Sequence, residues 1–302
     1  MLVGKLKEIW RFPVKSLGGE SLGASEIHKL GLAGDRGWAL IDGDTGDICS
    51  AKNTPKLLNL KARYLTEPDS EVAYGSEVSG IAIEFPDGRS IEDPREASLA
   101  ISEYIGKSLE LYPLQPPENL DHYRLSTPLG EAEFTRMFNI QAGEDGPDFS
   151  DYTDSVIAEL SEYACRPGTY YDVFPLHLLT TASLSHMQVL SDADFDVRRF
   201  RPNLLIETLP EIRGVAEFDW VGKGLRIGDT VLHVESRTIR CSMPSREQTH
   251  YGITQSPAIS KTIYQTTNRY FGANISVIDA GALHAGDDIE LIDIDQTTRR
   301  DL

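Results

Sequence analysis

The sequence predicts an α+β fold that is mostly β, with antiparallel strands rolled into barrels and few helices. Short segments of strand composition, bounded by Gly, Pro or Asp-Gly turn residues, fill the first forty residues and return in the last third of the chain. Segments with helical spacing of apolar residues are few and lie between them. At 302 residues, the chain is long enough for two domains.

Five strands are predicted in the first part of the chain, over 2–12, 22–29, 38–42, 57–65 and 81–85. Gly43 and Gly46 follow the third strand and predict a hairpin turn, because glycine accepts the positive φ that such turns require. Residues 86–88, Pro-Asp-Gly, then turn the chain toward a short strand at Ser90 and Ile91.

A helix is predicted next, because Asp93 can cap it, Pro94 suits its first position and Gly106 can end it. Prolines then gather over residues 113–128, and such rigid, donor-poor sequence is typical of a domain boundary. The second half is predicted to hold helices over 155–163, 182–190 and 256–270, and strands over 176–180, 203–207, 224–227, 230–235, 275–278 and 288–292.

The charge balance is strongly acidic, with 47 acidic and 29 basic residues and a formal net charge of −18. A surface this negative repels phosphate backbones, so nucleic acid is not an expected partner. Acidic residues concentrate over 144–154 and 287–295. Two interpretations stay open for them: solvated surface that keeps the protein soluble, or docking of a basic partner.

The spacing of the cysteines and the lengths of the apolar stretches indicate where in the cell the protein is expected. The three cysteines are widely spaced, with no Cys-X-X-Cys or Cys/His pattern of a zinc site or a disulfide framework, which favours a reducing compartment. No signal peptide is apparent at the start, and no stretch approaches the ~18 apolar residues of a membrane span. We therefore expect a cytoplasmic protein.

Cys241 is the first candidate for chemistry. It follows Arg240 directly after a predicted strand, and a neighbouring guanidinium favours the thiolate anion that soft metal ions bind. The alternative is an inert, buried cysteine, since free cysteine is among the most buried residue types.

Several cationic and hydroxyl-bearing positions could bind an anion. Arg198, Arg199 and Arg201 lead into Asn203, and guanidinium groups suit phosphate or carboxylate, although surface ion pairs would also explain them. Two predicted loops and one strand-to-helix junction offer further amides, hydroxyls and cations, although helix capping would also explain the junction. These positions are Lys15, Ser16, Gly34, Asp35, Arg36, Thr180, Thr181 and Ser183.

Five motifs resemble, in this order, those of MOSC proteins that carry a MOSC N-terminal β-barrel domain. They are Arg-Phe-Pro-Val-Lys-Ser at 11–16, Gly-Leu-Ala-Gly-Asp-Arg at 31–36, Arg-Phe-Arg-Pro-Asn at 199–203, Gly-Leu-Arg-Ile-Gly at 224–228 and Arg-Cys at 240–241. The resemblance implies an N-terminal β-barrel domain over residues 1–114 and a MOSC β-barrel domain over 125–293.

The resemblance also implies a pterin-based molybdenum cofactor, molybdopterin, with Cys241 as the catalytic metal ligand. The chain is similar to the mitochondrial amidoxime reducing component and its bacterial relatives, which implies an oxidoreductase that reduces small N-hydroxylated compounds. The positions that match those holding the pterin and its phosphate are Lys15, Ser16, Arg36, Thr180, Ser183, Arg201, Asn203 and Arg240. We expect electrons to come from a separate protein carrying flavin, haem or iron–sulfur, because no ferredoxin-like domain follows.

Departures from the family pattern keep other functions open. Residues 237–239 and 242–247 lack the second cysteine and the Thr-rich, Asp-Pro stretch that the reductases carry around the ligand. Cys241 could instead carry a persulfide for cofactor or cluster sulfuration, or the chain could be a binding protein that has lost the cofactor. The family is also associated with pyridoxal phosphate, but no lysine here is singled out as a Schiff-base former.

Overall fold

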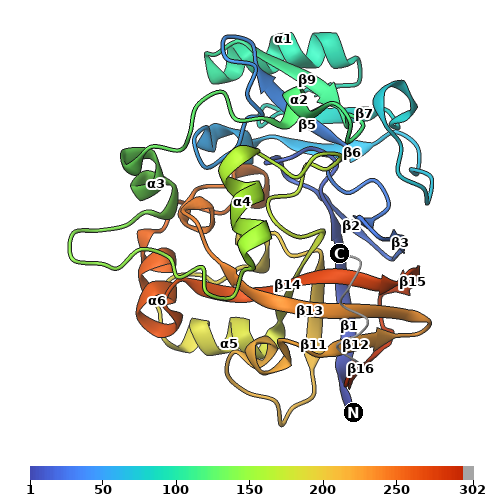
Figure 1. Ribbon diagram of the computed structural model, residues 1–302, viewed down its shortest axis with the longest axis vertical. Coiled ribbons are helices and arrows are strands. Elements are labelled where there is room, and N and C mark those ends of the chain that lie inside the picture. The colour runs from blue at the N-terminus through green and yellow to red at the C-terminus, as the bar shows by residue number, and fades with distance from the viewer. Residues whose placement is uncertain (295–302) are drawn as a thin grey trace.

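A closed β-barrel of seven strands is the largest unit of the computed structural model, which describes residues 1–294 (Figure 1). Each strand pairs with the next in the order β1, β11, β10, β14, β13, β12 and β16, and β16 returns to β1. All pairings are antiparallel except that of β10 with β11. The bounds are β1 Leu2–Arg11, β10 Leu176–Thr180, β11 Leu204–Thr208, β12 Gly224–Ile227, β13 Thr230–Ile239, β14 Tyr270–Asp279 and β16 Asp288–Ile292.

The N-terminal part forms two smaller sheets, drawn above the barrel in Figure 1, around a second hydrophobic core. One of them pairs β5 with β9, and the other joins β6, β7 and β8. In a further sheet, β3 pairs with both β4 and β15, and its buried apolar residues belong to the barrel core. Strand β2 (Glu20–Leu22) extends the barrel sheet beside β1. The bounds are β3 Ala24–His28, β4 Gly31–Leu32, β5 Trp38–Asp42, β6 Lys61–Tyr64, β7 Ile81–Glu84, β8 Ser90–Ile91, β9 Leu109–Pro113 and β15 Gly281–His284.

Helices are few and cover the outside of these sheets. The α-helices are α1 Pro94–Ile105, α2 Leu120–Tyr123, α3 Glu131–Phe138, α4 Asp154–Glu162, α5 Thr181–Val189 and α6 Pro257–Thr267. The 3-10 helices are η1 Pro55–Asn59, η2 Gly75–Glu77, η3 Val197–Arg199, η4 Ala216–Trp220, η5 Met243–Ser245 and η6 Thr249–Tyr251. The predicted mostly-β fold with few helices is confirmed. Within residues 1–294, no helix is long and apolar enough to cross a membrane.

Two of the predicted elements that differ from the structure have a clear physical reason. The strand expected over 57–65 begins only at Lys61, because Pro55 starts a 3-10 helix that buries Leu57 and Leu58. The helix expected over 256–270 ends at Thr267, since Asn268 has the left-handed φ of 49° and β14 starts at Tyr270. By contrast, the predicted cap of α1 is present, with Asp93 accepting from two first-turn amides and Gly106 at φ 83°.

The first strand of the chain belongs to the barrel made by the last third. Strand β1 pairs on one side with β11 and on the other with β16, and Val3, Leu6 and Ile9 are fully buried in the barrel core. A domain boundary at residues 114–125 would therefore leave β1 on the far side of the cut from its partner strands. The boundaries 1–114 and 125–293 remain predictions.

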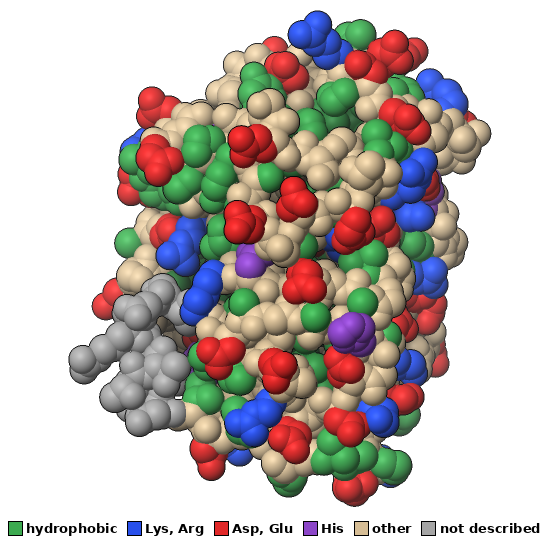
Figure 2. Space-filling model, turned by 90° about the vertical axis from the view of Figure 1, so that its right-hand side faces the viewer, with side chains coloured by type: hydrophobic (Ala, Val, Ile, Leu, Met, Phe, Trp, Pro, Cys, Tyr) green, Lys and Arg blue, Asp and Glu red, His purple; other side chains and the backbone are tan. Residues whose placement is uncertain are grey.

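The acidic stretch over 144–154 has basic partners within this chain. Asp151 forms an ion pair with Arg237 of β13 at 2.7 Å, and Glu144 pairs with Arg269 at 2.6 Å. These contacts hold residues 131–153, including α3, against the barrel. Elsewhere, acidic side chains are spread over the face shown in Figure 2 and do not gather in one patch. Asp295, at the end of the second acidic stretch, lies outside the described residues.

Candidate functional site

Several chain segments meet at one rim of the barrel, beside the N-terminal sheets. The pairing of β1 with β11 places the end of β1 beside the start of β11, and contacts of Arg240 with His177 and with the Phe200 carbonyl bring the residues after β13 to the same place. Residues 12–18 follow β1, Arg201 and Asn203 precede β11, and Arg240 and Cys241 follow β13. Most of the predicted cationic residues therefore lie at this rim.

Lys15 and Lys52 both form ion pairs with one carboxylate, that of Asp172. The Lys15 ammonium is buried, donates to Asp172 Oδ1 at 2.6 Å and also donates to the Tyr170 carbonyl at 3.0 Å. Lys52 Nζ lies 3.0 Å from the other oxygen, Oδ2. The two cations hold the pKa of Asp172 well below its usual range, against the opposing effect of desolvation. Asp172 is therefore ionised and neutralises part of this cationic site.

Arg36 and Arg201 lie together over the ring of Phe12. Their guanidinium carbons are 5.3 Å and 4.1 Å from the ring centroid. Burial and then the neighbouring charge of Arg36 lower the pKa of Arg201 to about 10. Two guanidinium groups in such proximity repel each other, so an anion between or beside them would be stabilised.

Three of the predicted site residues adopt a backbone conformation that non-glycine residues rarely adopt. Ser16, Arg36 and Arg201 have φ of 71°, 54° and 54°. A left-handed φ costs about 1 kcal/mol or more for such residues and persists where the surrounding structure imposes it. Its occurrence at three positions of one rim marks this rim as the strained, candidate functional part of the fold.

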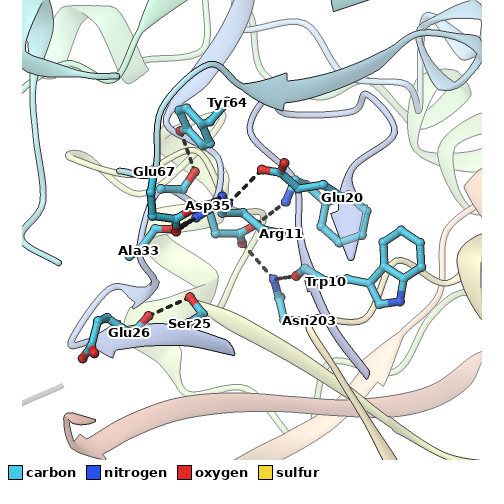
Figure 3. A network of polar contacts seen from close by, with 12 residues as sticks. Trp10, Arg11, Glu20, Ser25, Glu26, Ala33, Asp35, Tyr64, Glu67 and Asn203 are labelled. Carbon is cyan, nitrogen blue, oxygen red and sulfur yellow. Dashed lines mark hydrogen bonds and ion pairs between the residues drawn. The ribbon is translucent and has the colours of Figure 1, made fainter. Parts of the chain in front are cut away.

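A hydrogen-bonded clamp built on Asp35 and Asn203 holds the loop that carries Arg36 (Figure 3). Asp35 accepts from the Phe12 amide at 2.7 Å and from Asn203 Nδ2 at 3.0 Å, and it also pairs with Arg36. Asn203 Nδ2 donates further to the Trp10 carbonyl at 3.1 Å. The amide of Asn203 is thus occupied in joining β1 to the loop, which makes it a positioning residue for Arg36.

Arg240 is oriented by His177 at the start of β10. One Arg240 nitrogen donates to the Phe200 carbonyl at 2.9 Å, and another lies 3.2 Å from His177 Nε2. Desolvation and then the charge of Arg240 hold the pKa of His177 well below its usual value, so Nε2 is an acceptor. A β-carbon on Gly272, at φ 87°, would lie 2.2 Å from this nitrogen, so only glycine leaves room for the contact.

Cys241 differs from the other cysteines in exposure and in charge environment. Cys49 and Cys165 are buried, and burial raises the pKa of the Cys49 thiol to about 11. Cys241 is partly exposed, packs at the edge of the N-terminal core, and has Lys52 and Arg240 near enough for their charges to act on its sulfur. It is the described cysteine best placed to bind a metal.

Three buried polar atoms of the residues at this rim have no partner among the described residues. Arg201 Nη2, Arg240 Nε and the Ser242 hydroxyl have no hydrogen-bond partner within the described part of the chain. A buried donor without a partner costs about 1–3 kcal/mol, and more when charged. The donor set suits an anionic group with several oxygen or nitrogen acceptors, as the pterin and phosphate of a molybdenum cofactor would supply.

Thr180 and Ser183 have hydrogen-bond partners in the core of the protein. Both side chains are fully buried, and both donate to the carboxylate of buried Glu217, Thr180 at 2.8 Å. Thr180 also accepts from the Ser183 amide at 3.1 Å as the N-cap of α5. The structure thus gives these two hydroxyls capping and core partners, and their predicted role in cofactor binding stays a prediction.

The buried carboxyl of Glu217 should make the stability of the protein depend on pH. Desolvation raises its pKa from 4.5 to about 7, so wild type loses stability as pH rises between these values. Between pH 5 and pH 8, the unfolding free energy of wild type relative to Glu217→Gln should fall by about 2.5 kcal/mol, measured by urea unfolding. Exposed Glu207→Gln serves as control, and parallel pH profiles for wild type and Glu217→Gln would refute the assignment.

Four residues of the site escaped the sequence analysis: Lys52, Asp172, His177 and Ser242. Lys52 and Asp172 are brought to Lys15 only by the fold, and no local pattern marks either of them. His177 lies in an apolar strand, where histidine is most simply a core residue. Ser242 directly follows Cys241, and this position next to the candidate metal ligand was the feature of the sequence that could have indicated it.

Two family models match the chain. The MOSC domain model matches residues 158–290, and the MOSC N-terminal beta barrel domain model matches residues 3–98. The chain belongs to the MOSC family. MOSC domains are generally linked to the molybdenum cofactor. The motif-based resemblance is thereby confirmed, while the stretch between the two matches, including α3, lies outside both models.

Solved structures similar to this MOSC protein share little sequence with it. The YuaD protein from Bacillus subtilis is 9% identical, with a TM-score of 0.45, and the match covers 97% of this chain and 98% of that one. YiiM from Geobacillus stearothermophilus is 18% identical, with a TM-score of 0.31 and coverages of 40% and 55%. TM-scores below 0.5 do not establish a shared architecture. The search of curated proteins found no match.

Proposed function

We propose that this MOSC protein is a molybdenum-cofactor-dependent oxidoreductase that reduces small N-hydroxylated compounds, with Cys241 as the protein ligand to the metal. The observation that supports it most is the set of unpartnered cationic donors beside a partly exposed thiol. An inert cysteine would not require buried guanidinium nitrogens that lack hydrogen-bond partners at the same rim. The family membership supplies the class of cofactor.

The residues at the rim would divide the work of holding the cofactor. Arg201, Arg240 and the Ser242 hydroxyl would bind its anionic oxygens, and Lys15 and Arg36 would neutralise its phosphate. Cys241 would ligate molybdenum, which supplies two-electron redox chemistry when the cofactor is bound. The Ser16 hydroxyl accepts a hydrogen bond from the Ala51 amide at 2.9 Å. Like Asn203, Ser16 would therefore position a loop of the site.

Asp172 and Lys52 form an ion pair at 3.0 Å, and Lys52 lies near enough to Cys241 for its charge to act on the sulfur. Cleavage of an N–O bond to release water consumes two protons and two electrons. The electrons would come from a separate donor protein.

The test is an assay of wild-type protein purified from cells that make the cofactor. We expect stoichiometric molybdenum and reduction of benzamidoxime to benzamidine with a chemical electron donor. Protein that contains molybdenum but does not turn over benzamidoxime would reject the reductase assignment while leaving cofactor binding in place.

A second candidate is a sulfur carrier that uses a Cys241 persulfide. The partly exposed sulfur with Lys52 and Arg240 nearby favours it, because a terminal sulfur carries negative charge that these cations would stabilise. Cyanolysable sulfur on Cys241 in protein without molybdenum would favour this candidate over the reductase.

A further inference from the structure

We infer that Asp172 is a displaceable counter-ion, whose carboxylate occupies the anion position between Lys15 and Lys52 until the phosphate of an incoming ligand replaces it. The inference rests on the proposed function for the identity of that ligand, and it adds a residue that limits the affinity of the site. The chemistry it requires is an exchange of one oxyanion for another on the same two ammonium groups.

Lys15 cannot follow Asp172 if the carboxylate leaves. Its side chain is only 6% exposed, and its ammonium also donates to the Tyr170 carbonyl at 3.0 Å. An ammonium has three donors, so the hydrogen bond freed by Asp172 would point into the site. Lys52, at 22% side-chain exposure, faces the same position from the N-terminal part of the chain. A phosphate oxygen could take the place of each Asp172 oxygen.

The two carboxylates of the site differ sharply in how they are held. Asp35 has a side chain only 2% exposed, and its oxygens bind the Phe12 amide, Asn203 and Arg36. The Asp172 side chain is 48% exposed, lies between β10 and the preceding turn, and is held by two lysines. If Asp172 moved away from the two lysines, water could replace its lost ion pairs. Asp35 could not move without breaking the hydrogen bonds of the clamp.

Charge favours the exchange. Five cations face two carboxylates at this rim, and Arg201 and Arg240 are both near enough to Asp172 for their charges to interact with it. A phosphate carries more negative charge than the carboxylate it would replace, and it brings extra acceptors for the unpartnered Arg201 Nη2. The larger anion would therefore satisfy donors that Asp172 leaves unsatisfied.

The test uses the full chain made in cells unable to synthesise the cofactor, with pyrophosphate as probe and isothermal titration calorimetry as readout. Asp172→Asn keeps the size of the side chain and removes the competing charge, so pyrophosphate should bind about fivefold more tightly than to wild type. Lys15→Met should weaken binding at least tenfold, which places the probe at this site. Asp288→Asn is the matched control, because it removes a carboxylate that pairs with a lysine at the same 2.6 Å distance on barrel strand β16.

Equal or weaker binding by Asp172→Asn, or no binding by any variant, would overturn the inference. A measurement on wild type alone guards against misfolded variants: pyrophosphate should increase amide hydrogen exchange of residues 171–174, and unchanged or slower exchange there would also overturn the inference. The probe binds without cofactor, so a lack of molybdenum in purified protein would reject the proposed function and leave these results standing.

Discussion

Arg201→Met should stabilise the cofactor-free protein and abolish cofactor retention, two effects of opposite sign from one substitution. Arg201 is 9% exposed, its Nη2 atom lacks a partner, and Arg36 lies beside it. Relief of the unpartnered Nη2 and of the repulsion from Arg36 should outweigh loss of the hydrogen bond to the Leu17 carbonyl, and should raise the unfolding free energy of the cofactor-free protein by about 1–2 kcal/mol. The same change removes a cation from the phosphate position, so molybdenum content should fall at least tenfold.

Arg199→Met provides the matched control two residues away. Its guanidinium donates to the carbonyls of Asp194 at 2.8 Å, Pro244 at 3.2 Å and Thr254 at 3.1 Å, so each nitrogen is satisfied. Its loss should destabilise the protein by about 3 kcal/mol, because three buried carbonyls lose their donor. Urea unfolding of both variants measures these effects. Destabilisation by Arg201→Met comparable to that by Arg199→Met would mean that Arg201 is a structural residue like its neighbour.

Cys241→Ala should reduce benzamidoxime turnover by at least about a thousandfold, since the substitution removes the metal ligand on which the proposed chemistry depends. The fold should be retained, because this side chain is only partly buried at the edge of the N-terminal core. Turnover, molybdenum content and thermal stability should be measured together. Cys49→Ala is the control: its thiol is buried, and the variant should keep wild-type turnover. Turnover by Cys241→Ala within tenfold of wild type would exclude a role for its sulfur in catalysis.

The strand pattern of the sequence predicted the fold class because alternation and turn residues are local signals. Closure of the barrel was not predictable in the same way, since β1 pairs with β11 and β16, which lie some two hundred residues or more further along the chain. The 3-10 turn at Pro55 and the early end of α6 at Asn268 were missed because buried leucines and a left-handed cap override strand and helix propensity.

The candidate site was predictable where motif residues themselves carry the charge. Lys15, Arg36, Arg201 and Arg240 gather at one rim, as expected from a phosphate-binding interpretation. Thr180 and Ser183 were predicted in the same way, but both of their hydroxyls donate to Glu217. No residue near them in the sequence indicates that a buried carboxylate would be their partner. Asp172 was not predicted because its partners, Lys15 and Lys52, are more than a hundred residues away in the sequence.

The acidic stretch over 144–154 shows how a charge pattern can mislead about partners. Its composition allowed either solvated surface or docking to a basic partner, and Arg237 and Arg269 of the same chain satisfy Asp151 and Glu144. The segment also approaches the thiol, because the Ser242 amide donates to the Met137 carbonyl at 2.8 Å. Part of the net charge of −18 is thus used to hold residues 131–153 beside the site.

The most direct test of the central claim is anomalous diffraction at the molybdenum absorption edge from crystals of the cofactor-loaded protein. The proposed ligand predicts one anomalous peak within bonding distance of Cys241 Sγ, with Arg201 and Arg240 turned toward the density of the pterin and its phosphate. A molybdenum peak bonded to any other residue, or loaded crystals in which the Cys241 sulfur has no metal neighbour, would contradict it.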